Sequence, residues 1–164
     1  MFPDDINALA ATVIRLAIGR GLQVATAESC TGGLVAGALT GVAGSSAVVD
    51  RGFVTYSNAA KTDLVAVPAA LIEAHGAVSE AVARAMATGA LARSLAKVSV
   101  AVTGIAGPGG GAPDKPVGLV HFAAAGPDGV IHVEHRFGGI GREAVRLASV
   151  RVALDLLIDR LQAG

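Results

Sequence analysis

Residues with reactive side chains follow directly after a short apolar run, residues 22–27. The next six residues, 28–33, read Glu-Ser-Cys-Thr-Gly-Gly, and helix-like sequence follows. A strand that ends this way and opens a helix brings hydroxyl oxygens and backbone N–H groups to one point. That point can hold an anion, or can activate a hydroxyl beside an oxyanion site. Ser29 is therefore the first candidate nucleophile; the alternative is that Ser29 or Thr31 only caps the helix.

A nucleophilic hydroxyl needs a base, and the histidines of this chain are poor candidates. His132 and His135 lie three residues apart on a predicted strand, so they point to opposite faces and cannot chelate a metal together. His121 is alone on its predicted strand, and His75 lies near a helix end. The single Cys30 offers no zinc cluster. We therefore predict no metal site, and we expect Cys30 to be a small buried neighbour of the serine.

A lysine offers another kind of base. Tyr56 ends the predicted strand 48–56, and Lys61 lies on the helix predicted over 58–65, so both side chains are expected at the same end of the sheet. A lysine partly buried beside a second polar group can lose its proton near neutral pH and deprotonate a serine. The alternative interpretation is a solvated surface lysine.

Two further segments can bind a substrate. The loop 103–111 follows an apolar run and is rich in glycine, so its N–H groups can bind an anion or a carbonyl oxygen. It is neither a P-loop nor a dinucleotide-binding fingerprint, because no Gly-Lys-Ser/Thr follows it and it opens no helix. Arg142 and Arg146, one turn apart on the predicted last helix, can bind a phosphate. Exposed charges on an amphipathic helix are the alternative.

Hydrophobic periodicity supplies the elements that must position these residues. It predicts helices over about 4–19, 31–39, 58–65, 68–76, 79–96 and 141–161. Apolar and β-branched runs predict strands over 22–27, 48–56, 98–102, 117–125 and 130–137, the last two joined by a hairpin turn at 126–129. This order predicts one α/β domain over residues 1–164, a layered α/β/α sandwich with a mixed central sheet.

Composition narrows the class of protein. Apolar residues make up 52% of the 164 residues but aromatic ones only 3%, so Ala, Val, Leu and Ile must form the core. The 13 basic residues equal the 13 acidic ones, which argues against nucleic acid or an anionic membrane as the main partner. One cysteine fits a reducing compartment, and no signal peptide or membrane span is expected. We predict a cytoplasmic protein that forms a homo-oligomer, most simply a dimer.

Several segments together resemble the CinA-like family, the C-terminal domain of competence/damage-inducible proteins, which also occurs as a stand-alone nicotinamide-nucleotide amidohydrolase. The similarity extends from about Ile6 to Leu161, and no molybdopterin-binding-like domain precedes it, so the stand-alone form is expected. The segments that carry the resemblance are 27–33, 44–46, 51–58 with Lys61, 75–80, and 103–108 with 115–118.

The resemblance implies hydrolysis of the carboxamide of nicotinamide mononucleotide to nicotinate mononucleotide and ammonia, without metal or cofactor. It implies that Ser29 is the nucleophile and Lys61 the general base, with Tyr56 assisting; Ser45 is an alternative nucleophile. The resemblance assigns Thr31 and Gly32 to the nucleotide substrate, and Thr103, Gly104 and Ile105 to the substrate or to the oxyanion. It places Ser45, Ser46 and Arg142 near the ribose phosphate. The competing hypotheses are a non-catalytic module that binds a nucleotide or a protein, and an amidase for another small amide.

Overall fold

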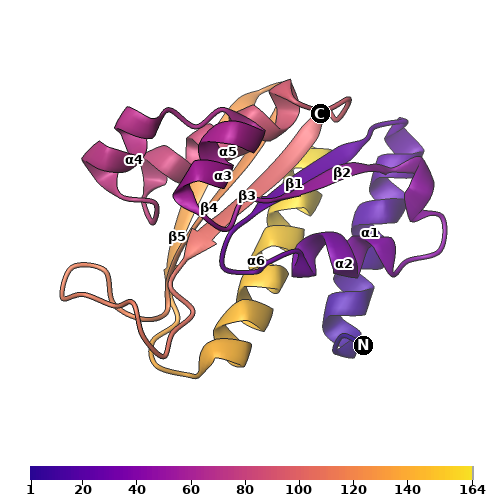
Figure 1. Ribbon diagram of the computed structural model, residues 1–164. Helices are drawn as coiled ribbons and strands as arrows, with labels where there is room; N and C mark the ends of the chain where they lie inside the picture. The colour runs from indigo at the N-terminus through magenta and orange to yellow at the C-terminus, as the bar shows by residue number, and fades with distance from the viewer. Residues whose placement is uncertain (164) are drawn as a thin grey trace.

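The computed structural model describes residues 1–163 (Figure 1). Its elements, in chain order, are α1 (Asp4–Arg20), β1 (Val24–Glu28), α2 (Leu34–Thr40), the short 3-10 helix η1 (Ser45–Ala47), β2 (Val49–Val54), α3 (Asn58–Val65), α4 (Ala69–His75), α5 (Glu80–Ala92), β3 (Val98–Gly104), β4 (Leu119–Gly126), β5 (Gly129–Arg136) and α6 (Arg142–Gln162).

The five strands form one mixed sheet in the order β2-β1-β3-β4-β5. β1 pairs in parallel with both β2 and β3, whereas β3, β4 and β5 pair antiparallel through the predicted hairpin. Every residue of β1 is buried, and so are all but the last residue of β3 and of β4. Strands covered on both faces read as continuous apolar runs, which is why the sequence shows them clearly.

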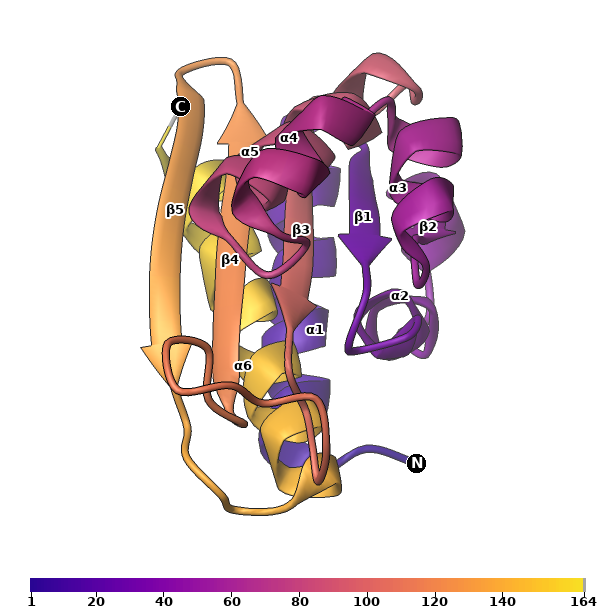
Figure 2. The same ribbon diagram turned by 60° about the vertical axis from the view of Figure 1, so that its left-hand side comes forward.

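Helices cover both faces of the sheet. α1, α2 and α6 pack on one face, and α3, α4 and α5 pack on the other (Figures 1 and 2). The first face is covered with Val, Leu and Ile side chains, whereas the second is built largely from alanines of β1, β3, β4 and α5. The predicted α/β/α sandwich with a mixed sheet is therefore confirmed.

Several predicted boundaries shift where the chain turns. β1 begins at Val24 rather than residue 22, because the N–H of Leu22 donates to the carbonyl of Ala17 and so belongs to the end of α1. α2 begins at Leu34 rather than residue 31, because residues 29–33 form a turn in which Gly32 and Gly33 have positive φ. The predicted α5 stops at Ala92 instead of residue 96.

The topology collects three connections at one edge of the sheet. β1, β2 and β3 run parallel, so their carboxyl ends lie together, and the chain leaves each of them there. In open α/β sheets this edge is where ligands bind. The segments that meet at it are the 29–33 turn, residues 55–57 before α3, and the loop 105–118 before β4.

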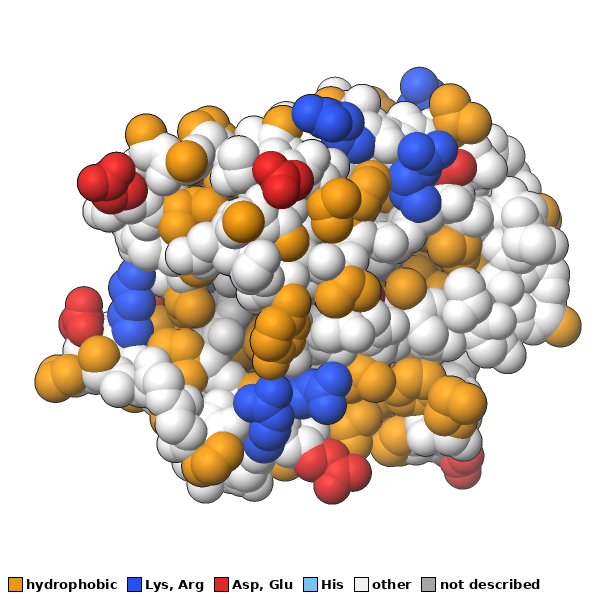
Figure 3. Space-filling view, viewed as in Figure 1, with side chains coloured by type: hydrophobic (Ala, Val, Ile, Leu, Met, Phe, Trp, Pro, Cys, Tyr) orange, Lys and Arg blue, Asp and Glu red, His pale blue; other side chains and the backbone are white. Residues whose placement is uncertain are grey.

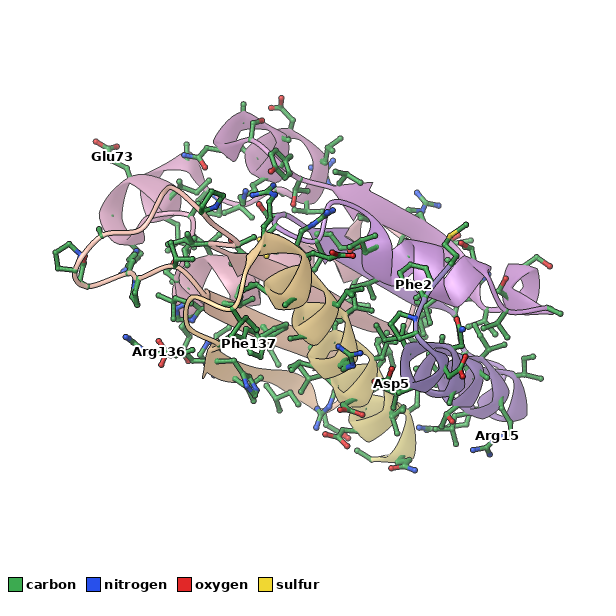
Figure 4. The ribbon with its side chains drawn as sticks, turned by 90° about the horizontal axis from the view of Figure 1, so that it is seen from below. Phe2, Asp5, Arg15, Glu73, Arg136 and Phe137 are labelled. Carbon is green, nitrogen blue, oxygen red and sulfur yellow. The ribbon has the colours of Figure 1, made fainter. Side chains whose placement is uncertain are left out.

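On the opposite side of the molecule from α3–α5, α1 and α6 lie side by side (Figure 4), where Asp5 of α1 forms an ion pair with Arg151 of α6.

No helix within residues 1–163 is both long enough and apolar enough to span a membrane.

Candidate active site

Ser29 is the first residue after β1. Its backbone N–H donates to the carbonyl of Val102 on the neighbouring β3, at 2.9 Å, so the backbone remains attached to the sheet while the chain begins to turn. The side chain is half-buried and faces a pocket at the carboxyl edge. Its position is set by the strand before it and by the glycine turn after it.

Lys61 reaches Ser29 from α3. The helix begins after Ser57, whose hydroxyl accepts a hydrogen bond from the N–H of Ala60 at 3.0 Å and so caps it. The side chain of Lys61 is only 1% exposed. Its Nζ lies 3.1 Å from Ser29 Oγ. The predicted pairing of the serine after β1 with a lysine from the helix that follows β2 is therefore present in the structure.

The surroundings of the Lys61 amine are neutral. Nζ donates to the backbone carbonyls of Thr55 at 2.8 Å and Tyr56 at 3.4 Å. No carboxylate forms an ion pair with it within the described chain. Burial therefore lowers the pKa of Lys61 below its ordinary value of 10.5, because the charged form loses its hydration without gaining a countercharge.

The glycine-rich loop forms the wall beside β3. Thr103 is buried, and its hydroxyl donates to the carbonyl of Ala77 at 2.9 Å, which holds the α4–α5 connection over the pocket. Ile105 donates to the carbonyl of Leu119 at 2.9 Å and accepts from the N–H of Gly118 at 2.8 Å. The side-chain hydroxyl of Thr103 and the backbone of Ile105 are thus fixed by the protein itself.

Tyr56 and Arg142 lie at the mouth of the pocket. The Arg142 guanidinium donates to the Tyr56 hydroxyl at 3.1 Å and to the carbonyl of Gly107 at 2.8 Å. It therefore connects the segment after β2 to the glycine-rich loop. A guanidinium has five N–H donors, so this one keeps donors for a ligand. Figure 3 shows Lys and Arg side chains below the central groove of this face.

The pocket encloses about 290 Å³. Of the sequence-predicted residues, Ser29, Lys61, Tyr56, Thr103, Gly104, Ile105 and Arg142 line it together. No acidic side chain of the described residues is among those that line it. The other lining residues are Cys30, the expected neighbour of Ser29; Ala106, Gly107, Gly109 and Gly110 of the glycine-rich loop; and Asn58, Ala77 and Val78, to which the sequence assigned no role.

Ser45 and Ser46 lie elsewhere. They belong to the 3-10 helix before β2, at the amino end of that strand, whereas Ser29 follows the carboxyl end of the parallel β1. The Ser45 hydroxyl donates to the carbonyl of Thr40 at 3.3 Å, and both serines line a different hollow. The structure therefore does not bring Ser45 and Ser46 together with Ser29, and among the described residues no lysine is hydrogen-bonded to Ser45.

Thr31 and Gly32 do not line the pocket either. Thr31 is fully buried, and Gly32 lies close to the side chain of Arg146. The start of α2 already holds an anion that the sequence did not reveal. The buried Glu28 carboxylate accepts the N–H groups of Val35 at 2.9 Å and Ala36 at 3.1 Å. These amides are thus occupied by the protein's own carboxylate.

Two other expectations concern Cys30 and the histidines. Burial raises the pKa of the Cys30 thiol to about 12, which fits its expected part as an inert neighbour of Ser29. His132 and His135 do lie on opposite faces, but His121 is not isolated: its Nδ1 lies 2.9 Å from Nε2 of His132 on the next strand. Within residues 1–163, no group of three or more His, Cys, Asp or Glu residues is placed to hold a metal.

The chain matches a known protein family over nearly its whole length. A model of the CinA C-terminal domain matches residues 6–161. The chain belongs to the CinA C-terminal domain family. CinA-like proteins of Synechococcus sp. (strain RCC307) and Anaeromyxobacter dehalogenans (strain 2CP-C) are each 52% identical to it, over 162 and 157 residues. These matches cover 98% and 96% of this chain but 38% of each relative, so the chain spans well under half the length of these CinA-like proteins.

Solved structures of the CinA superfamily share the fold. A competence/damage inducible protein from Agrobacterium tumefaciens is 58% identical, with a TM-score of 0.97 over 99% of both chains. A CinA superfamily protein from Escherichia coli is 38% identical, with a TM-score of 0.90 over 96% of this chain and 92% of its own. At these identities the family and the fold are shared along almost the whole chain.

Proposed function

We propose that this CinA-family chain is a serine amidohydrolase that hydrolyses the carboxamide of nicotinamide mononucleotide to nicotinate mononucleotide and ammonia. The observation that carries the proposal is the contact of 3.1 Å between Ser29 Oγ and the buried Nζ of Lys61. A hydroxyl becomes a nucleophile when an adjacent base removes its proton, and a lysine with a lowered pKa can be that base.

The hydrogen bonds of Lys61 favour this role. A neutral amine has two N–H donors and one lone pair. The carbonyls of Thr55 and Tyr56 can accept both donors, which leaves the lone pair facing the hydroxyl of Ser29. The same two carbonyls remain partners when the amine becomes protonated. The amine therefore keeps its place through a cycle of proton transfer.

The proposed reaction has two halves. Lys61 accepts the Ser29 proton as Oγ bonds to the carboxamide carbon; the C–N bond then breaks, and the ammonium of Lys61 returns the proton to the departing ammonia. A water molecule next attacks the acyl-serine ester and gives a proton to Lys61. The ester C–O bond breaks, the proton returns to Ser29 Oγ, and the product leaves as a carboxylic acid, which ionises in water.

Backbone N–H groups on two sides of the pocket are available to stabilise the oxyanion in the proposed reaction. Cys30 follows the nucleophile directly, and Ala106 and Gly107 lie on the loop across the pocket. Their N–H groups make no backbone hydrogen bond within the described residues, unlike that of Ile105. We assign them to the negative oxygen of the tetrahedral intermediate, where such donors have their largest effect.

The charge of the pocket favours an anionic substrate. Arg142 lies at its mouth, and the described residues that line it include no carboxylate. Arginine binds phosphate through paired donors, so a nucleotide phosphate is the group we assign to it. This feature also distinguishes the proposed mononucleotide from an uncharged small amide, which has no group for Arg142.

Release of ammonia from nicotinamide mononucleotide tests the proposal. We expect the purified chain to release ammonia and to form nicotinate mononucleotide in equal amounts, and Ser29→Ala to lower kcat by at least about 10³-fold. Ser45→Ala is the matched control and is expected to retain the wild-type rate, because the Ser45 hydroxyl bonds to the carbonyl of Thr40 and lines a different hollow from Lys61. Full activity in Ser29→Ala, or ligand-dependent thermal stabilisation without turnover, would contradict the proposal and favour a binding module.

A further inference from the structure

Two backbone hydrogen bonds hold the turn that presents Ser29. Gly32 and Gly33 both have positive φ, and glycine is the residue with the most backbone freedom to lose. Within the turn, the N–H of Gly32 donates to the carbonyl of Ser29, and the N–H of Leu34 donates to the carbonyl of Thr31, each at 3.0 Å. The buried Thr31 hydroxyl has no hydrogen-bond partner within residues 1–163, so it does not fix the turn. The carbonyl of Cys30 accepts neither of these two bonds, so a donor from outside the turn can add to them there.

Arg146 of α6 contacts the turn from below. Its Nε donates to the carbonyl of Cys30 at 3.1 Å, and its Nη2 donates to the carbonyl of Thr31 at 3.2 Å. These are the two successive carbonyls after Ser29. Because the guanidinium is planar and rigid, two bonds from it fix the orientation of both peptide planes relative to each other and to α6.

Arg146 acts behind the pocket and not within it. It does not line the pocket, whereas Arg142, one turn earlier on α6, does. Within the described chain it forms no ion pair, and both of its bonds go to backbone carbonyls. Arg142, and not Arg146, is therefore placed to bind a substrate phosphate in the pocket, so the two arginines have different roles.

We propose that Arg146 is a positioning residue that holds the 29–33 turn so that Ser29 Oγ stays within reach of Lys61. The inference rests on the proposed function in one respect, the role of Ser29 as nucleophile. Placement matters here because a displacement of about 1 Å at a reacting group can lower a rate by about 10²-fold. The sequence left Arg146 either as a phosphate ligand beside Arg142 or as an exposed charge, whereas in the structure its guanidinium donates to the backbone of the turn.

Three variants test the proposal. Arg146→Met removes both donors, and we expect kcat for ammonia release to fall by about 10²-fold while KM changes by less than about threefold. Arg146→Lys keeps a donor that can reach one carbonyl, and it should recover part of the lost kcat. Arg151→Met removes an exposed ion pair with Asp5 from the same helix, and it should leave both constants unchanged.

Hydrogen exchange provides a readout that does not require turnover. In Arg146→Met the amides of Gly32 and Leu34, which are hydrogen-bonded within the turn, should exchange faster than in the wild type, while those of β3, at 98–102, should not. An unchanged kcat, a raised KM at unchanged kcat, or unchanged exchange in the turn would overturn the positioning role. If the wild type releases no ammonia, the proposed function fails, and the exchange experiment alone then decides whether Arg146 holds the turn.

Discussion

Lys61 is the residue on which the proposed chemistry depends. Its amine is buried and uncompensated, so its pKa is lowered, and a larger share of it is neutral at a given pH than for a solvated lysine. Only the neutral amine can accept a proton. Reactions of Ser29 that need this base should therefore accelerate as the pH rises through the lowered pKa of Lys61, and should become independent of pH above it.

The sequence predicted the residues that line the pocket better than the residues that support them. Ser29, Tyr56 and Lys61 could be placed because each follows a recognisable strand. Glu28 and Arg146 could not, since their partners become visible only in three dimensions: Glu28 caps a helix seven and eight residues ahead, and Arg146 reaches back 115 and 116 residues. Local sequence pattern carries no signal for such contacts.

α3, the helix that carries Lys61, is held against α5 by a very close contact. At Gly89 of α5, an added Cβ would lie 1.7 Å from the backbone carbonyl oxygen of Val65, the last residue of α3. Only glycine permits the two helices to approach this far. The position of α3, and therefore that of the Lys61 amine, depends on the absence of a side chain at Gly89.

Gly89→Ala should therefore affect both stability and activity. The added methyl group must push α3 away, so we expect the free energy of unfolding to fall by about 1–3 kcal/mol and kcat to fall with it. Gly19→Ala in α1 is the control, because no atom lies within 4 Å of its added Cβ and alanine favours a helix by about 0.5–1 kcal/mol. Denaturant unfolding measures the change in stability of both variants, and ammonia release measures the change in kcat. Equal effects of the two changes would show that the close contact does not hold α3.

The order of elements was predictable, but several of their ends were not. The alternation of helix and strand periods and the turn at 126–129 predicted the mixed α/β sandwich. Helix and strand ends depend on where backbone hydrogen bonds go, as at Leu22, whose N–H closes α1 instead of joining β1. The same limit applies to Ser45 and Ser46. The sequence does not show at which end of the sheet their short helix lies, because that depends on how the strands are arranged.

Across the molecule, the far edge of the sheet carries a second set of titratable groups. His121 and His132 stack with their ring centres 5.2 Å apart and share a hydrogen bond between strands β4 and β5. Their pKa values are lowered from 6.5, first by burial and, for His121, by its neighbour. The charged groups that face the pair are Glu80 and Arg84 of α5, Glu134 of β5 and Lys115 of the loop before β4.

These lowered values predict how stability depends on pH. Below about pH 6.5 the unfolded chain binds protons that the folded pair resists, so stability should decrease as the pH falls from 6.5 toward the lowered pKa values. His132→Gln removes one titrating group, and its Tm should fall less than the wild-type Tm between about pH 7 and pH 5. His75→Gln, at an exposed site, is the control. Identical pH dependences in the wild type and His132→Gln would refute this account.

Family membership belongs to the whole chain, since the family match spans residues 6–161. It agrees with the resemblance seen in the sequence motifs, which are spread over the same span. The dimer and the cytoplasmic location that the sequence suggests stay predictions.

The reaction of Ser29 with a small sulfonyl fluoride, followed as a function of pH, tests the central claim most directly, because it needs no knowledge of the substrate. We predict that modification occurs at Ser29, that its rate rises through one pKa below 10.5, and that Lys61→Met lowers the rate by about 10²-fold or more and abolishes this pH dependence. Peptide mass spectrometry locates the modified residue. Equal rates in the wild type and Lys61→Met, or modification at another serine, would contradict the assignment of Lys61 as the base for Ser29.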